Sequence, residues 1–291
     1  MGNFADELRD KLKVKALSDP RSTEELISAA LSDQEDDAES DPLLVLWYRG
    51  NRETFEAAKD LCQNPDPDKR WLGPRILGQL GVPDSPFLEE SVEILLDLLA
   101  TEQHPEVLQF VASACGDLGA EKTVPALVAL KHHADAGVRF GVVIGLLCQE
   151  DEQAIQALIE LSSDDDREVR NWATFGLADM IEIDTPAIRE ALYERLRSEP
   201  AGEADEVYGE ALVGLAIRKD DRVVEPLLKE LSSEYVGRLA VEAASYISHP
   251  KLYNILMRLR EWWDVDKNLL EDAIENSTGK AGETSNENYF A

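Results

Sequence analysis

The stretch V-R-F-G-V-V-I-G-L at residues 138–146 decides the fold of this 291-residue chain, because V-R-N-W-A-T-F-G-L repeats its frame at residues 169–177. In both stretches a valine–arginine pair leads into apolar and small residues at helical spacing. The same frame, with substitutions, starts at four further anchors: Lys69, Val107, Val207 and Val236. The six anchors are 29 to 38 residues apart, a period that is typical of stacked helix pairs.

A second apolar pattern precedes each anchor, as Leu95, Leu96 and Leu99 precede Val107. Spacings of three and four residues predict a first helix in every unit, followed by a short turn and a second helix. The chain is therefore predicted to be an all-α superhelix with little or no strand. Glycine costs about 1 kcal/mol in a helix interior relative to alanine. We therefore expect neighbouring second helices to approach closely at their glycines, which are Gly73, Gly78, Gly116, Gly145, Gly176 and Gly214.

These residues resemble the HEAT-repeat proteins, in particular the bacterial HEAT-like repeats that also occur in phycobilin lyases. The resemblance rests on residues 68–70 with Leu80-Gly81, on 138–146, and on D-R-E-V-R at 166–170 with Leu177. It covers about residues 52–263 and implies a HEAT-like solenoid fold. The first unit departs from the pattern because Lys69 stands where valine is expected. Pro74 lies inside the same helix, which we expect to be kinked.

The repeat pattern predicts one elongated domain with distinct ends. Residues 1–51 are interpreted as N-terminal capping helices with an acidic loop at 32–42, and residues 52–275 as the solenoid. Ser22 and Glu25 have the spacing of a capping box at the start of a helix. Residues 276–291 are rich in Gly, Ser, Thr, Asn and Glu, so a disordered tail is predicted.

Charge is the second strong signal, since 59 acidic residues against 29 basic ones give a net charge of −30. This charge opposes binding to nucleic acid and to anionic membranes. Two explanations remain open: solubility of a long exposed surface, or recognition of a basic partner with electrostatic steering. The sequence has no run of about 18 apolar residues and no signal-peptide pattern at its start. We therefore expect a cytoplasmic protein that is a monomer when free.

Signals for catalysis are weak. The chain has no phosphate-binding glycine loop, and its four histidines lack ligand-like neighbours in sequence. Asp164 to Asp166 with Glu168 imitate the start of a calcium loop, but the required glycine and final glutamate are missing. Asp166 is instead predicted to cap a helix. Cys62, Cys115 and Cys148 are interpreted as core thiols. No catalytic residue, metal ligand or cofactor is predicted.

An arginine ladder is predicted from Arg70, Arg139 and Arg170, which occupy the same position in their repeats. In a HEAT-like array such an arginine usually reaches an acidic residue in an adjoining turn. Candidate partners are Asp68, Asp135 and Asp166. The ladder is interpreted as structural, because such ion pairs contribute little energy singly but fix the orientation between repeats.

The second helices also carry unusually many apolar residues outside the side that is predicted to face the core. Helical geometry places these positions on the inner, concave surface, where solenoids bind partners. The predicted partner-binding residues are Trp71, Phe140, Val143, Ile144, Asn171, Phe175, Leu212 and Val213. The alternative is that superhelical curvature or a flanking helix buries these side chains.

The sequence thus favours a non-catalytic, protein-binding repeat protein that recognises a basic partner through its concave surface. A sharper version is an inhibitor or immunity-type protein that covers a basic effector. Two alternatives stay open: a chromophore lyase or lyase chaperone of the phycobilin-lyase type, which the repeat resemblance suggests at the level of fold only, and a passive scaffold.

Overall fold

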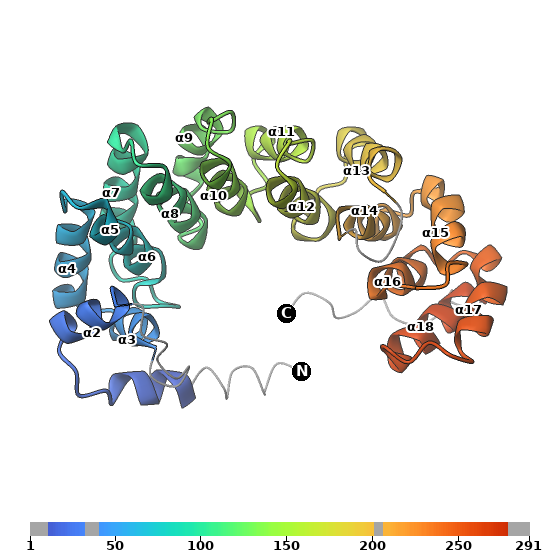
Figure 1. Ribbon diagram of the computed structural model, residues 1–291, viewed down its shortest axis with the longest axis horizontal. Coiled ribbons are helices and arrows are strands. Elements are labelled where there is room, and N and C mark those ends of the chain that lie inside the picture. The colour runs from blue at the N-terminus through green and yellow to red at the C-terminus, as the bar shows by residue number, and fades with distance from the viewer. Residues whose placement is uncertain (1–10, 33–40, 201–205, 279–291) are drawn as a thin grey trace. The chain divides into compact units, whose positions relative to one another are not determined.

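The computed structural model describes residues 11–32, 41–200 and 206–278 (Figure 1). Within these ranges every regular element is a helix, which confirms the predicted all-α fold. The chain forms two compact units, unit 1 at residues 1–153 and unit 2 at residues 154–291. This division has no counterpart in the sequence pattern, because the repeat frame passes through it without interruption.

Unit 1 begins with a helical segment at residues 11–17, followed by two short helices and then by helix pairs. Its helices are α2 (Thr23–Ala30), α3 (Pro42–Arg49), α4 (Arg52–Cys62), α5 (Pro67–Arg70), α6 (Leu72–Gln79), α7 (Leu88–Thr101), α8 (Pro105–Asp117), η2 (Glu121–Thr123), α9 (Val124–Ala129) and α10 (Ala136–Leu146). In this unit α7 packs on α8, α9 packs on α10, and α6, α8 and α10 pack side by side. We call α6, α8 and α10 the second-helix row of unit 1 (Figure 1).

Unit 2 repeats the arrangement. Its helices are α11 (Glu152–Leu161, whose first two residues belong to unit 1), α12 (Arg167–Phe175), η3 (Gly176–Met180), α13 (Pro186–Ser198), α14 (Glu206–Ile217), η4 (Asp221–Val223), α15 (Val224–Leu231), α16 (Arg238–Ile247), η5 (Pro250–Leu252), α17 (Tyr253–Leu259) and α18 (Lys267–Ser277). The second-helix row of unit 2 consists of α12, α14, α16 and α18, which pack in that order.

The valine anchors of the repeat lie in the core, as their position in the frame requires. Val107, Val138, Val169 and Val207 are fully buried, and Val236 is 4% exposed. Lys69, which replaces valine in the first unit, is exposed instead. The apolar period thus marks the buried side of each second helix.

Glycines bring neighbouring second helices together, as predicted for four of the positions. A Cβ on Gly116 would lie 2.6 Å from the Ile144 carbonyl oxygen and 2.8 Å from the Cα of Gly145. A Cβ on Gly145 would lie 2.5 Å from the Ala112 oxygen. The same holds for Gly78 against Ala114 and for Gly214 against Ala178. Gly73 differs, because its close neighbours Ala58 and Cys62 belong to the first helix α4.

The predicted kink in the first unit is a break between two helices. α5 ends at Arg70 and α6 begins at Leu72, with Trp71 between them. Pro74 lies in the first turn of α6, where it has no N–H to donate to the carbonyl group of Arg70 four residues earlier. Trp71 itself keeps right-handed helical dihedral angles at this break, with φ −59° and ψ −27°.

The ends of the described chain differ slightly from the predicted boundaries. Ser22 and Glu25 form the capping box of α2, as predicted. α18 continues to Ser277, whose side chain is buried, so the last helix passes the predicted boundary at residue 275. The acidic stretch 33–40, the first ten residues and residues 279–291 lie outside the described residues. None of the described helices has both the length and the apolar character needed to cross a bilayer.

Candidate functional site on the second-helix row

The three arginines that the sequence predicts to form a ladder share one geometry. Arg70, Arg139 and Arg170 each donate from Nη1 to the carbonyl oxygen six residues earlier, at 2.5, 2.9 and 2.7 Å. Arg70 also binds Glu102 with Nε at 2.6 Å, and Arg170 binds Glu199 with Nε at 2.9 Å. Both glutamates follow the first helix of the next pair. Arg70 and Arg170 therefore join consecutive repeats.

The acidic partners proposed from sequence are wrong. Asp135 and Asp166 use their carboxylates to cap α10 and α12, accepting from the backbone N–H groups of Val138 and Val169. The prediction that Asp166 is a helix cap is thereby confirmed. Asp68 lies within the short helix α5, exposed to solvent. A capping carboxylate accepts hydrogen bonds from the backbone at the start of its own helix, so it is not available to the arginine. For Arg70 and Arg170 the carboxylate comes from the next repeat instead.

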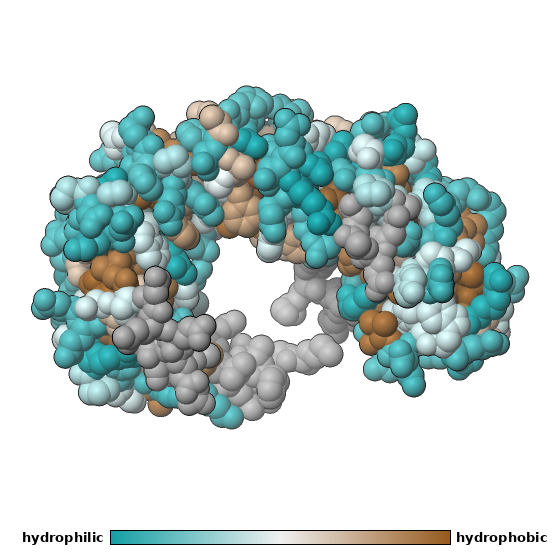
Figure 2. Space-filling view, in the orientation of Figure 1, coloured by the Kyte–Doolittle hydropathy of each residue, from teal (hydrophilic) through white to brown (hydrophobic). Residues whose placement is uncertain are grey.

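The structure separates the eight predicted partner-binding residues into two groups. Val143, Leu212 and Val213 are only 0%, 1% and 3% exposed, so they belong to the core and present no surface to a partner. Their apolar character is explained by burial, the alternative left open by the sequence. The other five are partly exposed on the second-helix rows: Trp71, Phe140 and Ile144 in unit 1, and Asn171 and Phe175 in unit 2. Figure 2 shows hydrophobic surface where α10, with Phe140 and Ile144, lies.

In unit 1 Trp71 belongs to a cluster that the sequence did not predict. Its ring lies 5.4 Å from that of Phe110 on α8, and the guanidinium of Arg75 lies 5.2 and 5.3 Å from the two ring centroids. Trp71 and Arg75 are one helical turn apart, a signal visible in sequence. Phe110 was missed because it stands three residues after the anchor Val107, outside the positions assigned to the inner surface.

In unit 2 the second-helix row carries a cluster of carboxylates around Glu210 on α14. Burial, followed by repulsion from Asp179, Glu242 and Glu206, raises the pKa of Glu210 to about 7. Glu206 accepts a hydrogen bond of 3.0 Å from Asn171 Nδ2, and Glu242 pairs with Arg238 at 2.5 Å. Glu210 thus lies among like charges from three neighbouring elements, η3, α14 and α16.

The raised pKa of Glu210 predicts a pH-dependent stability. Below pH 4.5, the ordinary pKa of a glutamate in the unfolded chain, the Glu210 carboxyl group is protonated in both the folded and the unfolded state, so it does not affect the free energy of unfolding. Between pH 4.5 and about 7 the unfolded state loses this proton while the folded state keeps it. The free energy of unfolding therefore falls as the pH rises through this range. We expect Glu210→Gln to raise the free energy of unfolding by about 2 kcal/mol at pH 8 and by almost nothing at pH 4. Urea denaturation at the two pH values measures this. Equal effects at both would contradict the assignment.

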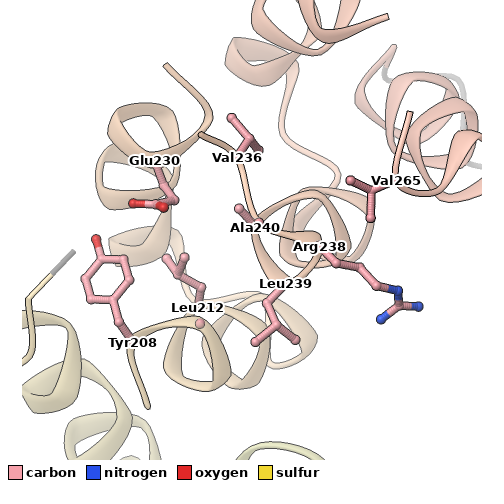
Figure 3. Close-up of a pocket in the computed structure, with 10 residues that line it drawn as sticks. Tyr208, Leu212, Glu230, Val236, Arg238, Leu239, Ala240 and Val265 are labelled. Atoms are coloured by element: carbon pink, nitrogen blue, oxygen red, sulfur yellow. The ribbon is translucent and has the colours of Figure 1, made fainter. Parts of the chain in front are cut away.

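Unit 2 also contains a pocket of about 240 Å³ between α14, the end of α15 and the start of α16 (Figure 3). Figure 3 shows the hydroxyl of Tyr208 pointing toward Glu230 at one end of it. Burial and the negative charge of Glu230 raise the pKa of Tyr208, so its hydroxyl group keeps its proton. Leu212, Leu239 and Val265 supply apolar walls. Leu212 lines this pocket, which accounts for its apolar side chain.

The cysteines of the described residues differ in burial, and two of the histidines bond to nearby backbone groups. Cys62 and Cys115 are buried, and burial raises the pKa of each thiol to about 12. Cys148 is exposed, which corrects the prediction that it is a core thiol; α10 ends at Leu146, before it. His133 and His249 each accept a backbone N–H two residues later. Within the described ranges no three His, Cys, Asp or Glu side chains are placed to hold a metal ion.

Comparison with known proteins places this architecture in a class. Residues 92–178, which include α8, α10 and α12, match the family model described as HEAT repeats. This stretch therefore has the sequence pattern of HEAT repeats, and the fold of the chain is an all-α, HEAT-like helical-repeat solenoid.

Among individual proteins, the chain is similar to Protein YibA of Escherichia coli strain K12, with 26% identity over 238 residues, 79% of this chain and 82% of YibA. The X-ray structure of E. coli YibA has a TM-score of 0.68 at 23% identity and covers 94% of this chain and 96% of that one. The CpcE–CpcF complex of phycocyanin lyase from Nostoc gives a TM-score of 0.48 at 18% identity, covering 88% of this chain and 95% of that one. A likeness at that level supports no inference about activity.

Proposed function

We propose that this protein is a non-catalytic binding protein that recognises a basic protein partner through the exposed side of its second-helix rows. The observation that carries the proposal is the carboxylate cluster of Glu206, Glu210 and Glu242 in unit 2. In the free protein the electrostatic repulsion among these carboxylates is not relieved. A lysine or arginine side chain that enters the cluster would relieve it and would restore the charged form of Glu210.

Aromatic side chains beside the cluster provide anchors for the same partner. The rings of Trp172 and Phe175 on α12 meet edge to face, with centroids 5.7 Å apart, and Phe175 is partly exposed. Asn171 on the same helix holds Glu206. Apolar anchors surrounded by charge are typical of interface hot spots, in which aromatic residues contribute much of the binding energy. In unit 1 Trp71, Phe140 and Ile144 supply comparable surface.

The first test of the proposed function removes the anchors. Phe175→Ala and Phe140→Ala are each expected to weaken binding of a purified partner by about 2 kcal/mol or more, roughly thirtyfold, while the protein stays folded. Tyr253→Ala is the matched control, because Tyr253 is an exposed aromatic residue on the first helix α17. The partner is found by affinity capture and mass spectrometry, then binding is measured with purified proteins. Equal losses for Tyr253→Ala, or no loss for either phenylalanine, would refute the proposed face.

The second test addresses the charge. Combined Glu206→Gln and Glu242→Gln is expected to slow association with the partner and to reduce its dependence on salt, with little change in dissociation. Glu225→Gln on α15 is the control, because Glu225 is exposed on a first helix, where it pairs with Lys251. Stopped-flow kinetics at two ionic strengths measures both rates. A partner whose association is faster in high salt would show that the acidic surface repels it.

A finer form of the proposal is that the chain inhibits a basic effector by covering its anion-binding face. The net charge of −30 supports this form, because it complements a protein built to bind phosphate or nucleic acid. The partner's own activity, assayed with and without an equimolar amount of this chain, separates inhibition from scaffolding. Inhibition that disappears in Phe175→Ala is the expected result.

A further inference from the structure

Arg52, Arg75 and Arg222 lie over aromatic rings, and the first and last of them also bind carboxylates. Arg52 lies 4.6 Å from the centroid of Phe87 and binds Glu90 at 2.9 Å. Arg222 lies 4.5 Å from the centroid of Tyr193 and binds Glu190 at 2.7 Å. In both, the ring covers the face of the guanidinium while a glutamate side chain receives its N–H groups. The protein thus uses one local arrangement twice: ring, arginine and carboxylate.

Arg75 has the rings without the carboxylate. It lies between α6 and α8 over Trp71 and Phe110, and no hydrogen bond or ion pair joins its guanidinium to any residue in the described ranges. Its nitrogen atoms still reach the surface, since none is among the buried polar atoms that lack a partner. Burial lowers the pKa of Arg75, and the charges of Asp41 and Asp117 oppose this shift without a hydrogen bond. Arg75 is therefore a partly desolvated cation whose donor atoms keep some access to solvent.

The cluster is held in place before any ligand arrives. The indole N–H of Trp71 donates to the carbonyl oxygen of Asp68 at 2.9 Å, which fixes that ring at the break between α5 and α6. The indole N–H of Trp47 donates to the carbonyl oxygen of Arg75, also at 2.9 Å, which fixes its backbone. Because these groups are ordered in advance, a ligand that meets them loses less free energy to ordering the site.

We propose that Trp71, Arg75 and Phe110 form a subsite for one aspartate or glutamate side chain of a protein partner. The guanidinium edge offers parallel N–H donors with the geometry of a carboxylate, and the rings accept an adjacent apolar side chain. A side chain is the chosen source because glutamate side chains complete the same arrangement at Arg52 and Arg222. The nearby Asp41 and Asp117 disfavour a run of acidic residues, so the subsite takes a single carboxylate beside apolar neighbours.

This inference rests on the proposed function only in using the second-helix row as the binding face, and it concerns unit 1 alone. The test uses protein labelled with 5-fluorotryptophan, in which Trp71→Phe assigns the Trp71 signal. The probe is the capped peptide acetyl-Leu-Glu-Leu-amide, compared with its glutamine counterpart and with acetyl-Leu-Gln-Leu carrying a free carboxyl terminus. The fluorine signal of Trp71 is followed by NMR as each peptide is added.

The glutamate peptide is expected to shift the Trp71 signal with a dissociation constant on the order of 1 mM. The glutamine peptide, and the glutamate peptide on Arg75→Gln, should bind at least tenfold more weakly. Arg52→Gln is the control and should not change the titration. Equal binding of the glutamate and glutamine peptides would overturn the proposal, as would preferential binding of the free carboxyl terminus. Neither result bears on the basic partner of unit 2, so failure here and failure of the proposed function are separable.

Discussion

Replacing Arg218 by methionine is expected to lower the free energy of unfolding by about 3–5 kcal/mol. Arg218 lies near the end of α14 and is only 7% exposed. Its two terminal nitrogens donate to four carbonyl oxygens: Leu177 at 2.7 Å, Ala178 and Ile181 at 2.9 Å, and Gly214 at 3.1 Å. Three of these belong to or directly follow the π-helix η3.

The effect is large because the carbonyl groups would remain buried without donors. A helix end leaves several carbonyl oxygens unsatisfied, and η3 uses an arginine from the next repeat to satisfy them. Arg197→Met is the matched control: it removes an exposed arginine of α13 that pairs with the exposed Glu194, and it should cost about 1 kcal/mol or less. Chemical denaturation measures both variants. Equal costs would show that Arg218 does not hold η3 in place.

Gly116→Ala is expected to destabilise the protein by about 2 kcal/mol, although alanine is the better helix former by about 1 kcal/mol. The new methyl group would lie 2.8 Å from the Cα of Gly145 and 2.6 Å from the oxygen of Ile144. Both are backbone atoms, so α8 and α10 must move apart to admit it. The buried residues of the two helices, among them Val111 on α8 and Val142 on α10, would then pack less closely.

The control for this substitution is Gly119→Asn. Gly119 has a φ of +60°, a Cβ at this position would have no atom within 4 Å, and asparagine tolerates this conformation. We expect a change of less than about 1 kcal/mol. Thermal melts of the two variants make the comparison. If Gly116→Ala raised the melting temperature, the close approach of the second helices would not be what the glycines provide.

The repeat architecture could be predicted from sequence because it depends on a local period. The anchors Val138 and Val169 recur with small residues at fixed offsets, and each buries the same side of its helix. Arg218 could not be predicted in this way. A single buried arginine does not recur with the repeat period. Its acceptors in η3 also lie about 40 residues earlier in the chain.

The candidate site was predictable only in part, because helical phase alone does not give burial. Leu212 and Val213 stand at inner positions of α14, yet that helix is enclosed on nearly every side and both residues are core. Phe175 and Trp71 are assigned to inner positions by the same helical spacing, and these two side chains are partly exposed. The carboxylates around Glu210 and the stack of Arg75 on Phe110 join different repeats, so only the folded chain reveals them.

The central claim is that a protein partner binds the exposed side of the second-helix row, and hydrogen–deuterium exchange with a purified partner tests it most directly. We predict slower exchange in the peptides that cover α12, α14 and α16, around Phe175, Glu210 and Glu242, on addition of the partner. Exchange in α13, α15 and α17 should stay unchanged. Protection confined to those first helices, with none on the second-helix row, would contradict the claim.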